Sequence, residues 1–197
     1  MAELVVGVTG ASGAVCARAL IRGILTVTAV RRIHVVVSRF ASQSVRLELG
    51  VAEKGEDGIR RALAGDPSER VLFHSAEDMA APIASGTYPV AGMAIVPCSA
   101  GTLGAIATGA TGNLIHRAAD VSLKERRPLV LAIRETPLNR VHLRNLLTVS
   151  EAGATVLPLI PSFYTHPESV QDILDQFAGR ILDQLSLAHS VGRRWGA

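Results

Sequence analysis

Residues 94–135, which read AIVPCSAGTLGAIATGATGNLIHRAADVSLKERRPLVLAIRE, decide the fold. The apolar run at 94–96 predicts a buried strand, and the small-residue turn at 100–102 opens a helix. A second, charged helix leads into the apolar run at 128–133, which ends in the charged pair 134–135. This order of strand, polar turn, helix, strand and charged pair is typical of a ligand site at the carboxyl edge of a parallel sheet.

The rest of the chain alternates between the same two patterns. Strands are predicted at 3–9, 33–37, 70–74, 93–96, 129–133 and 155–159, and helices at 14–26, 39–49, 138–152 and 168–187. Residues 50–69 are polar and glycine-rich, and they predict a surface excursion with a short helix at 59–64. Strands that alternate with helices predict one α/β domain, residues 1–197, built on a right-handed, doubly wound parallel sheet.

The composition is apolar without a membrane span. Hydrophobic residues make up 48% of the chain and the mean hydropathy is +0.32. Strands buried on both faces, or surfaces buried between copies of the chain, would each explain these values. No apolar run is long enough to cross a bilayer, and the acidic start of MAELVVGVTG is unlike a signal peptide. We therefore expect a cytoplasmic protein with no membrane partner.

The charge pattern favours small anions over nucleic acid. The net charge is +3 with no long basic run, and only Lys54 and Lys124 are lysines. Arginine pairs bidentately with phosphate, so the chain suits an anionic small molecule. Cys16, Cys98 and the scattered histidines lack the spacing of a metal site, so no metal is expected.

Polar residues follow the predicted strands at their carboxyl ends. They are Thr9 to Gly13, Ser38, Ser99 to Thr102, Arg134-Glu135, and Tyr164. Because the carboxyl ends of parallel strands share one edge of the sheet, we expect these positions to converge on a ligand.

Each of these positions also has a simpler interpretation. The turn from Gly10 to Gly13 suits an anion at a helix N-terminus, but it is neither GxGxxG nor a P-loop, and it could serve tight packing alone. Ser38 and Ser99 could be ordinary helix N-caps. Cys98 fits a small buried hydrophobic residue better than a nucleophile.

The charged residues of the stretch have alternatives too. Arg117, Asp120, Lys124 and Arg127 recur at a spacing of three to four and could form a solvated helix face. Arg134-Glu135 could be a structural ion pair.

Several motifs resemble the flavin prenyltransferase (UbiX) family along nearly the whole chain. They are TGASGA, PCSAGTL, NLIHRAADVSLKERRPLVLAIRETP, HLRNLL, and the ending with FY and GRILDQL. The resemblance implies a flavodoxin-like (Rossmann-like) fold, FMN, and no metal. It implies transfer of a dimethylallyl group from dimethylallyl monophosphate to N5 and C6 of reduced FMN. The product, prenylated FMN, would serve a UbiD-type decarboxylase, and the family's members are usually dodecamers.

The matching motifs imply roles for particular residues. FMN would be held by Gly10, Ala11, Ser12, Ser38, Ser99, Ala100, Gly101, Thr102 and Arg134. The prenyl phosphate would contact Arg117, Lys124, Tyr164, Arg180 and Trp195, and the tail at about 188–197 would reach a neighbouring subunit. Catalytic roles would fall to Ser12, Glu48, Lys124 and Glu135.

Physical chemistry agrees with these implied roles. A phosphate leaving group needs cations, and Lys124, Arg134 and Arg180 supply them without a metal ion. Glu135 could accept or relay a proton as the phosphate departs.

The chain departs from the family's usual pattern at a few positions. Arg39 stands where a lysine is frequent, Met79 where some members have tryptophan, and Thr165-His166 displaces the histidine of FYHxP by one residue. These changes touch no charged catalytic position, but they could alter contacts with the prenyl chain.

Two other functions remain open. An FMN-dependent decarboxylase of cysteine-derived carboxylates would keep the flavin site but would not need Lys124, Glu135 and Arg180. A non-enzymatic flavin-binding subunit of a decarboxylase would bind FMN without turnover.

Overall fold

A computed structural model describes residues 1–53, 55–65 and 68–196 of the chain. Lys54 and Ala197, the last residue of the predicted tail, lie outside these ranges. The sheet is formed by β1 (Ala2–Val8), β2 (Val30–Val37), β3 (Val71–His74), β4 (Gly92–Cys98), β5 (Leu129–Ile133) and β6 (Thr155–Pro158). The helices are α1 (Ala14–Thr26), α2 (Arg39–Leu49), α3 (Glu56–Ala64), the 3-10 turn η1 (Pro82–Ala84), α4 (Ala100–Ala107), α5 (Leu114–Lys124), α6 (Arg140–Glu151) and α7 (Val170–Gln184).

The six strands pair in the order β3-β2-β1-β4-β5-β6, and every pair is parallel. The order reverses direction between β1 and β4, which makes this point the topological switch of the sheet. Without the edge strand β3, the remaining order is that of flavodoxin. The predicted flavodoxin-like, doubly wound sheet is confirmed.

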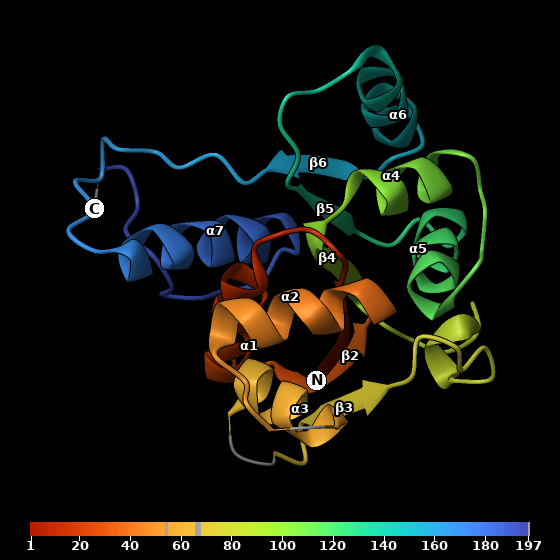
Figure 1. The fold of residues 1–197 in the computed structure, drawn as a ribbon, viewed down its shortest axis with the longest axis horizontal. Helices are drawn as coiled ribbons and strands as arrows, with labels where there is room; N and C mark the ends of the chain where they lie inside the picture. Colours follow the sequence, from red (N-terminus) through yellow and green to blue (C-terminus); the bar gives the residue numbers. More distant parts are fainter. Residues whose placement is uncertain (54, 66–67, 197) are drawn as a thin grey trace.

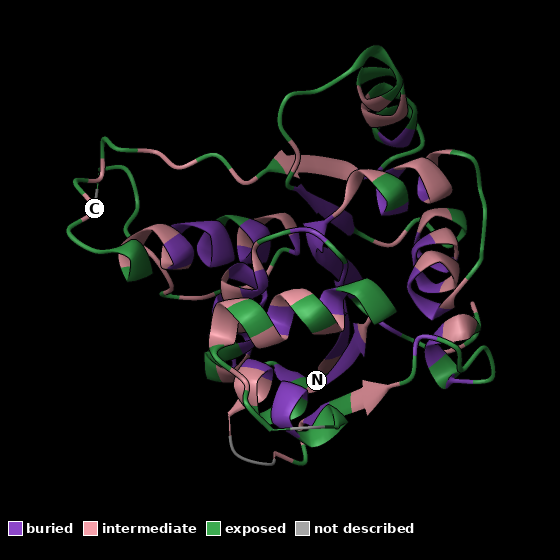
Figure 2. Ribbon diagram, viewed as in Figure 1, coloured by how far each residue is buried: buried purple, intermediate pink, exposed green. Residues whose placement is uncertain are grey.

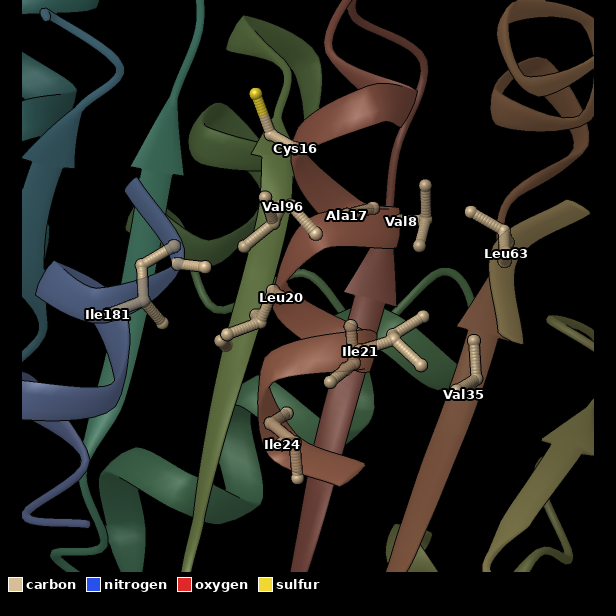
Figure 3. Close-up of a cluster of buried hydrophobic side chains, with 14 of the residues drawn as sticks. Val8, Cys16, Ala17, Leu20, Ile21, Ile24, Val35, Leu63, Val96 and Ile181 are labelled. Atoms are coloured by element: carbon tan, nitrogen blue, oxygen red, sulfur yellow. The ribbon is translucent and has the colours of Figure 1, made fainter. Parts of the chain in front are cut away.

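One face of the sheet is covered by α1, α2, α3 and α7. Apolar residues of α1 recur at helical spacing, so Ala17, Leu20, Ile21 and Ile24 all point to the sheet. Figure 3 shows these side chains lying over the strands, with Val96 of β4 close to Leu20. This packing fixes where the turn before α1 meets the end of β4.

The other face is covered by α4 and α5, as Figure 1 shows. Leu103 of α4 and Ile115 of α5 are fully buried against Ile95 and Leu131 of the sheet. The two cores together enclose both faces of β1 and β4, which explains the continuous apolar runs of the sequence.

Helix α6 lies apart from both cores. It is the expected amphipathic helix, yet only Val149 is buried, while Val141, Leu143 and Leu147 are each more than half exposed. Figure 2 shows α6 standing away from the sheet, mostly in the exposed and intermediate colours, with a buried part at its lower end. Its apolar face is therefore not covered by the described part of this chain.

Helix α5 ends earlier than the charge pattern suggested. Its last residue is Lys124, and Arg126 adopts a left-handed backbone with φ 55 in the turn that follows. Glu125, Arg126 and Arg127 therefore lie outside the helix, which corrects the expectation of one continuous charged helix face.

Within the ranges that the structure describes, no helix combines the length and the apolar character that a bilayer span requires.

Candidate functional site

The buried hydroxyl of Thr9 joins the two turns at the switch point of the sheet. Thr9 Oγ1 donates to the carbonyl of Pro97 at 2.8 Å and accepts the N–H of Ser99 at 2.9 Å. Thr9 is only 1% exposed, so both bonds are shielded from water. The Thr9 hydroxyl, together with the Thr9 N–H, which donates to the same Pro97 carbonyl at 3.2 Å, therefore fixes the end of β1 relative to the end of β4.

The turn from Gly10 to Gly13 needs its glycines. A Cβ at Gly10 would lie 2.7 Å from Cβ of Phe40, so only glycine lets the start of α2 approach this turn. Gly13 has φ +126, a conformation that side-chain-bearing residues rarely adopt. Ser12, between them, is exposed at the rim.

Glu48, near the end of α2, is bound to this same turn. Both of its carboxylate oxygens accept the N–H of Gly13, at 2.9 and 3.0 Å. Gly13 is the N-cap residue of α1, where the helix dipole favours a negative charge. The carboxylate is thus held one residue along the chain from Ser12, and its predicted role in proton handling stays a prediction.

Both cysteines are buried thiols. Burial, with a smaller contribution from the charge of Glu48, raises the pKa of Cys16 to about 11, and burial raises the pKa of Cys98 to about 12. Both remain protonated at neutral pH and are poor nucleophiles. The interpretation of Cys98 as a small buried hydrophobic residue is confirmed.

Ser38 and Ser99 are helix N-caps. Ser38 Oγ accepts the N–H of Ala41 at 3.2 Å, and Ser99 Oγ accepts the N–H of Thr102 at 3.3 Å. The second cap leaves the N-terminus of α4 open, because a Cβ at Gly101 would meet nothing within 4 Å. Backbone N–H groups and a helix dipole at an open N-terminus suit a phosphate or another anion.

Arg134 and Glu135 follow β5 at the same edge. The N–H of Arg134 donates to the carbonyl of Cys98 at 3.2 Å, and its exposed guanidinium has no ion-pair or hydrogen-bond partner among the residues that the structure describes. Glu135 Oε1 accepts the N–H of Thr136 at 3.0 Å instead of pairing with Arg134. The alternative of a structural Arg134–Glu135 ion pair is therefore wrong, and a free cation stands beside the open N-terminus of α4.

These residues, hereafter the strand-end group, bring together the predicted flavin positions. The group consists of Gly10, Ala11, Ser12, Ser38, Ser99, Ala100, Gly101, Thr102, Arg134 and Glu135, with Glu48 beneath the first turn. An exposed cation and an open helix N-terminus fit the phosphate of FMN.

Arg117 and Lys124 are not part of this group in the single chain. Arg117 Nε donates to the carbonyl of Ala84 at 3.0 Å, and its guanidinium pairs with Asp120 at 2.8 Å. Lys124 pairs with Glu125, whose pKa is lowered first by that hydrogen bond and then by the charge of Lys124. The solvated-face interpretation therefore fits their bonds within one chain.

The end of α5 lies at the amino ends of the strands, whereas the strand-end group lies at their carboxyl ends. Lys124 comes just before the start of β5 and Arg134 just after its end, so a five-residue strand separates them. Such a strand is roughly 13 Å long. Lys124 therefore does not reach the strand-end group within one chain, and its predicted contact with the prenyl phosphate stays a prediction.

The sequence reading missed the loop that Arg117 and Lys124 face. Ser85 Oγ and Thr87 Oγ1 lie 2.9 Å apart around Gly86, and a Cβ at Gly86 would meet the ammonium of Lys124 at 2.5 Å. Of this loop, residues 79–89, only Met79 was named from the sequence. A glycine between two hydroxyl residues was the signal that could have identified it.

Tyr164, Arg180 and Trp195 line a separate cavity of about 240 Å³. The rings of Tyr164 and Trp195 meet edge to face with their centroids 5.1 Å apart. Figure 1 shows the segment after β6 and the C-terminal tail running past the start of α7, away from β4 and β5. The expectation that Tyr164 converges with the other strand ends is therefore wrong within one chain, because the segment after Pro158 leads away from the sheet.

The tail packs on its own chain. Arg194 pairs with Asp183 of α7 at 2.8 Å, and Arg193 donates to the carbonyl of Thr165 at 3.4 Å. Its predicted reach to a neighbouring subunit stays a prediction. In the part of the chain that is described, no cluster of His, Cys, Asp and Glu could hold a metal ion.

Comparison with known proteins connects this geometry to a family. A family model described as Flavoprotein matches residues 1–182. Flavin prenyltransferase UbiX of Halalkalibacterium halodurans is 44% identical over 195 residues, covering 97% of this chain and 92% of the relative. The chain belongs to the flavin prenyltransferase (UbiX) family. The UbiX protein of Escherichia coli K12 is 41% identical over 197 residues, covering 99% and 98% of the two chains.

Solved structures of UbiX proteins have the same fold. AnUbiX (PadA1) in complex with FMN and dimethylallyl pyrophosphate has a TM-score of 0.85 and 42% identity, covering 100% of this chain and 98% of its own. A dodecameric FMN-dependent UbiX-like decarboxylase from Escherichia coli O157:H7 also has a TM-score of 0.85, with 40% identity and 99% of both chains covered. The FMN-dependent cysteine decarboxylase TvaF, at 16% identity and a TM-score of 0.60, shares the fold alone.

The Thr9 hydroxyl leads to a prediction for this UbiX-family chain. Thr9→Val removes both bonds of the hydroxyl and leaves the Ser99 N–H unpaired, while the Pro97 carbonyl keeps its bond from the Thr9 N–H, so we expect a loss of about 1–3 kcal/mol in the free energy of unfolding. FMN should also bind more weakly, because the Ser99 turn loses its hydrogen bond to the Thr9 side chain. Urea unfolding and a flavin titration measure the two effects.

Thr26→Val is the matched control, because the Thr26 hydroxyl makes only a local bond to Gly23 at the end of α1. An unchanged flavin affinity in Thr9→Val would contradict the anchoring role.

Proposed function

We propose that this chain transfers a dimethylallyl group from dimethylallyl monophosphate to N5 and C6 of reduced FMN, and so makes prenylated FMN. The observation that carries the proposal is the end-to-end likeness to a structure that holds FMN and dimethylallyl pyrophosphate together, at 42% identity. The strand-end group supports it, because it offers a free cation and an open helix N-terminus.

The strand-end group is proposed to hold FMN. The reduced flavin supplies the nucleophilic N5 and C6 atoms and a π face that stabilises allylic cation character. The exposed guanidinium of Arg134 would bind phosphate, and Ser12 would lie near N5. Glu48 is bound to the same turn through the Gly13 N–H, and it would hold or move a proton near Ser12.

The prenyl phosphate is proposed to bind among arginine and lysine side chains. Lys124, Arg117 and Arg180 would stabilise the charge of the departing phosphate together with Arg134. Glu135 would accept or relay a proton as the phosphate departs. Tyr164 and Trp195 would cover the apolar chain and exclude water, which favours orientation of the donor over its hydrolysis.

We propose that neighbouring copies complete the site in a homo-oligomer, most simply a dodecamer. Within one chain, Lys124 and the Tyr164 cavity lie away from the strand-end group, so no single chain unites the charged set. The dodecameric relative and the uncovered apolar face of α6 both support assembly.

We further propose a cytoplasmic location, and delivery of prenylated FMN to a UbiD-type decarboxylase. A prenylated flavin is useful only to an enzyme that binds it, so such a partner has to accept this product. A decarboxylase of cysteine-derived carboxylates is disfavoured by the charged phosphate set, and a non-enzymatic flavin subunit is an outcome that the assay below separates.

The assay follows the mass of the flavin. FMN is bound, reduced anaerobically and mixed with dimethylallyl monophosphate, and the extracted flavin is expected to gain one five-carbon prenyl unit. Parallel reactions with dimethylallyl pyrophosphate identify the preferred donor, and a reaction without reductant is the control. Bound but unmodified FMN with both donors would refute the transferase and favour the decarboxylase or the subunit.

A further inference from the structure

The buried amide of Gln176 holds the segment that carries Tyr164. Gln176 lies on α7 and is only 8% exposed. Its neighbours Leu174 and Phe177 are apolar core residues, so a polar side chain at this depth needs partners. All of its side-chain partners come from the irregular segment between β6 and α7.

The amide is fully used. Gln176 Oε1 accepts the N–H of Ser162 at 3.2 Å and its hydroxyl at 2.9 Å. Gln176 Nε2 donates to the carbonyl of Ser162 at 3.0 Å and to the hydroxyl of Thr165. A primary amide has two acceptor positions and two donor hydrogens, so this set exhausts its capacity.

Tyr164 lies between the two residues that Gln176 holds. Tyr164 itself is more than half exposed, so burial does not fix its position. Its position is set by the anchors at Ser162 and Thr165 on either side and by the edge-to-face contact with Trp195. Arg193 of the tail also donates to the carbonyl of Thr165, so the tail rests on the same anchored backbone.

We infer that Gln176 is a positioning residue that sets the place of Tyr164, and through Tyr164 the place of Trp195, at the prenyl-phosphate side of the site. The part that concerns the donor rests on the proposed function. Thr165, the position where the family pattern often has histidine, supplies one of the anchors, so the Gln176–Thr165 contact is a feature of this chain's own sequence.

The chemistry of the anchor is specific to an amide. A carboxylate at position 176 has acceptors but no donor for the Ser162 carbonyl and the Thr165 hydroxyl. A leucine leaves every one of these groups without its partner. Both substitutions should release the segment, while the strand-end group, which contains neither Gln176 nor its partners, should keep its affinity for FMN.

The first readout uses the single tryptophan of the chain, Trp195. In full-length protein without donor, Trp195 is exposed but held by its edge-to-face contact with Tyr164, so Gln176→Leu and Gln176→Glu are expected to lower the steady-state anisotropy of Trp195 emission and to shorten its local rotational correlation time. Gln171→Leu, an exposed amide on the same helix, is the matched control and should leave both unchanged.

The second readout is the kinetics of prenyl transfer. In Gln176→Leu, KM for dimethylallyl monophosphate is expected to rise about tenfold, with kcat and FMN affinity within about twofold of wild type. Thr165→Val, which removes one anchor, should show a smaller change of the same kind, and Thr165→Ser should restore wild-type behaviour.

The outcomes separate the possible roles. An unchanged Trp195 signal in folded Gln176→Leu overturns the inference. The inference is also overturned if a lowered melting temperature is accompanied by a rise in KM and losses of kcat and FMN affinity that are all of similar size. If Gln176→Leu does not fold, Thr165→Val against Thr165→Ser decides in the same way. If wild type itself transfers no prenyl group, the proposed function fails, and the Trp195 readout still tests the positioning of Tyr164.

Discussion

Replacing Lys124 by alanine is expected to lower kcat/KM for prenyl transfer by about 10²-fold while FMN still binds, as for other removed transition-state charges. The ammonium is exposed and pairs only with Glu125 among the described residues, so its loss should change stability by less than about 0.5 kcal/mol. A departing phosphate gains negative charge, and a nearby cation stabilises that charge more than it stabilises the bound donor. Rates of prenylated FMN formation, measured with saturating flavin, test this.

Arg126→Asn is the matched control for Lys124→Ala. Arg126 is an exposed cation in the same turn, and asparagine tolerates its left-handed backbone. Mixed oligomers add a second test, because Lys124→Ala and Arg134→Ala remove groups from opposite edges of the sheet. If copies share the site, co-assembly of the two inactive variants restores part of the activity. Full activity of Lys124→Ala would contradict the assignment.

Replacing Glu3 by glutamine is expected to lower the free energy of unfolding by about 3 kcal/mol, the size of a broken buried ion pair. Glu3 is 3% exposed, and its carboxylate bonds to Tyr88 Oη at 2.5 Å and to His34 Nε2 at 2.9 Å, with Arg31 at 2.8 Å. His34 in turn contacts His74 at 2.8 Å, so one buried charge holds a chain of polar groups of which His34 is also buried. Urea unfolding at fixed protein concentration measures the loss.

The pH dependence of this difference has a definite sign. Burial raises the pKa of Glu3, but hydrogen bonds from Tyr88 and His34 and the charges of His34 and Arg31 outweigh it, so the pKa lies below its ordinary value of 4.5. A carboxyl with a lowered pKa stabilises the fold above its ordinary pKa and loses that effect as the pH falls through the folded value. The gap between wild type and Glu3→Gln should therefore be full above pH 4.5 and close in stronger acid.

Glu56→Gln is the matched control, because Glu56 pairs with Arg60 on the exposed face of α3 and should cost less than about 0.5 kcal/mol at any pH. A Glu3→Gln protein as stable as wild type at neutral pH would show that the buried network contributes nothing.

The sequence predicted the parts of the fold that depend on local pattern. A few consecutive residues are enough to recognise the apolar runs of β1, β4 and β5 and the small-residue turns that follow β1 and β4. Ser38 and Ser99 were recognisable as caps for the same reason. The edge where the strand-end group gathers then follows from parallel topology alone.

Features that depend on distant partners were not visible in the same way. Glu3 looked like one residue of an apolar strand, because Tyr88 and His34 lie far along the chain. Gln176 looked like an ordinary residue of a long helix, because its partners belong to the irregular segment between β6 and α7. That segment has no hydrophobic periodicity from which its course could be predicted. The position of Lys124 could have been predicted, because a helix that leads into the next parallel strand ends near the amino ends of the strands. The motif that contains Lys124 and Arg134 was instead considered as a whole.

Helix α6 separates folding from assembly. It rests on α4 and β6, and Val149 is its only buried residue. Changes at Val141, Leu143 or Leu147 would therefore leave the packing of one chain nearly intact and alter only what that surface meets. The amino-acid sequence of the exposed face of α6 can therefore change together with the surface that it contacts. The sequence of the sheet that carries the strand-end group is held by its own packing and does not have to change with it.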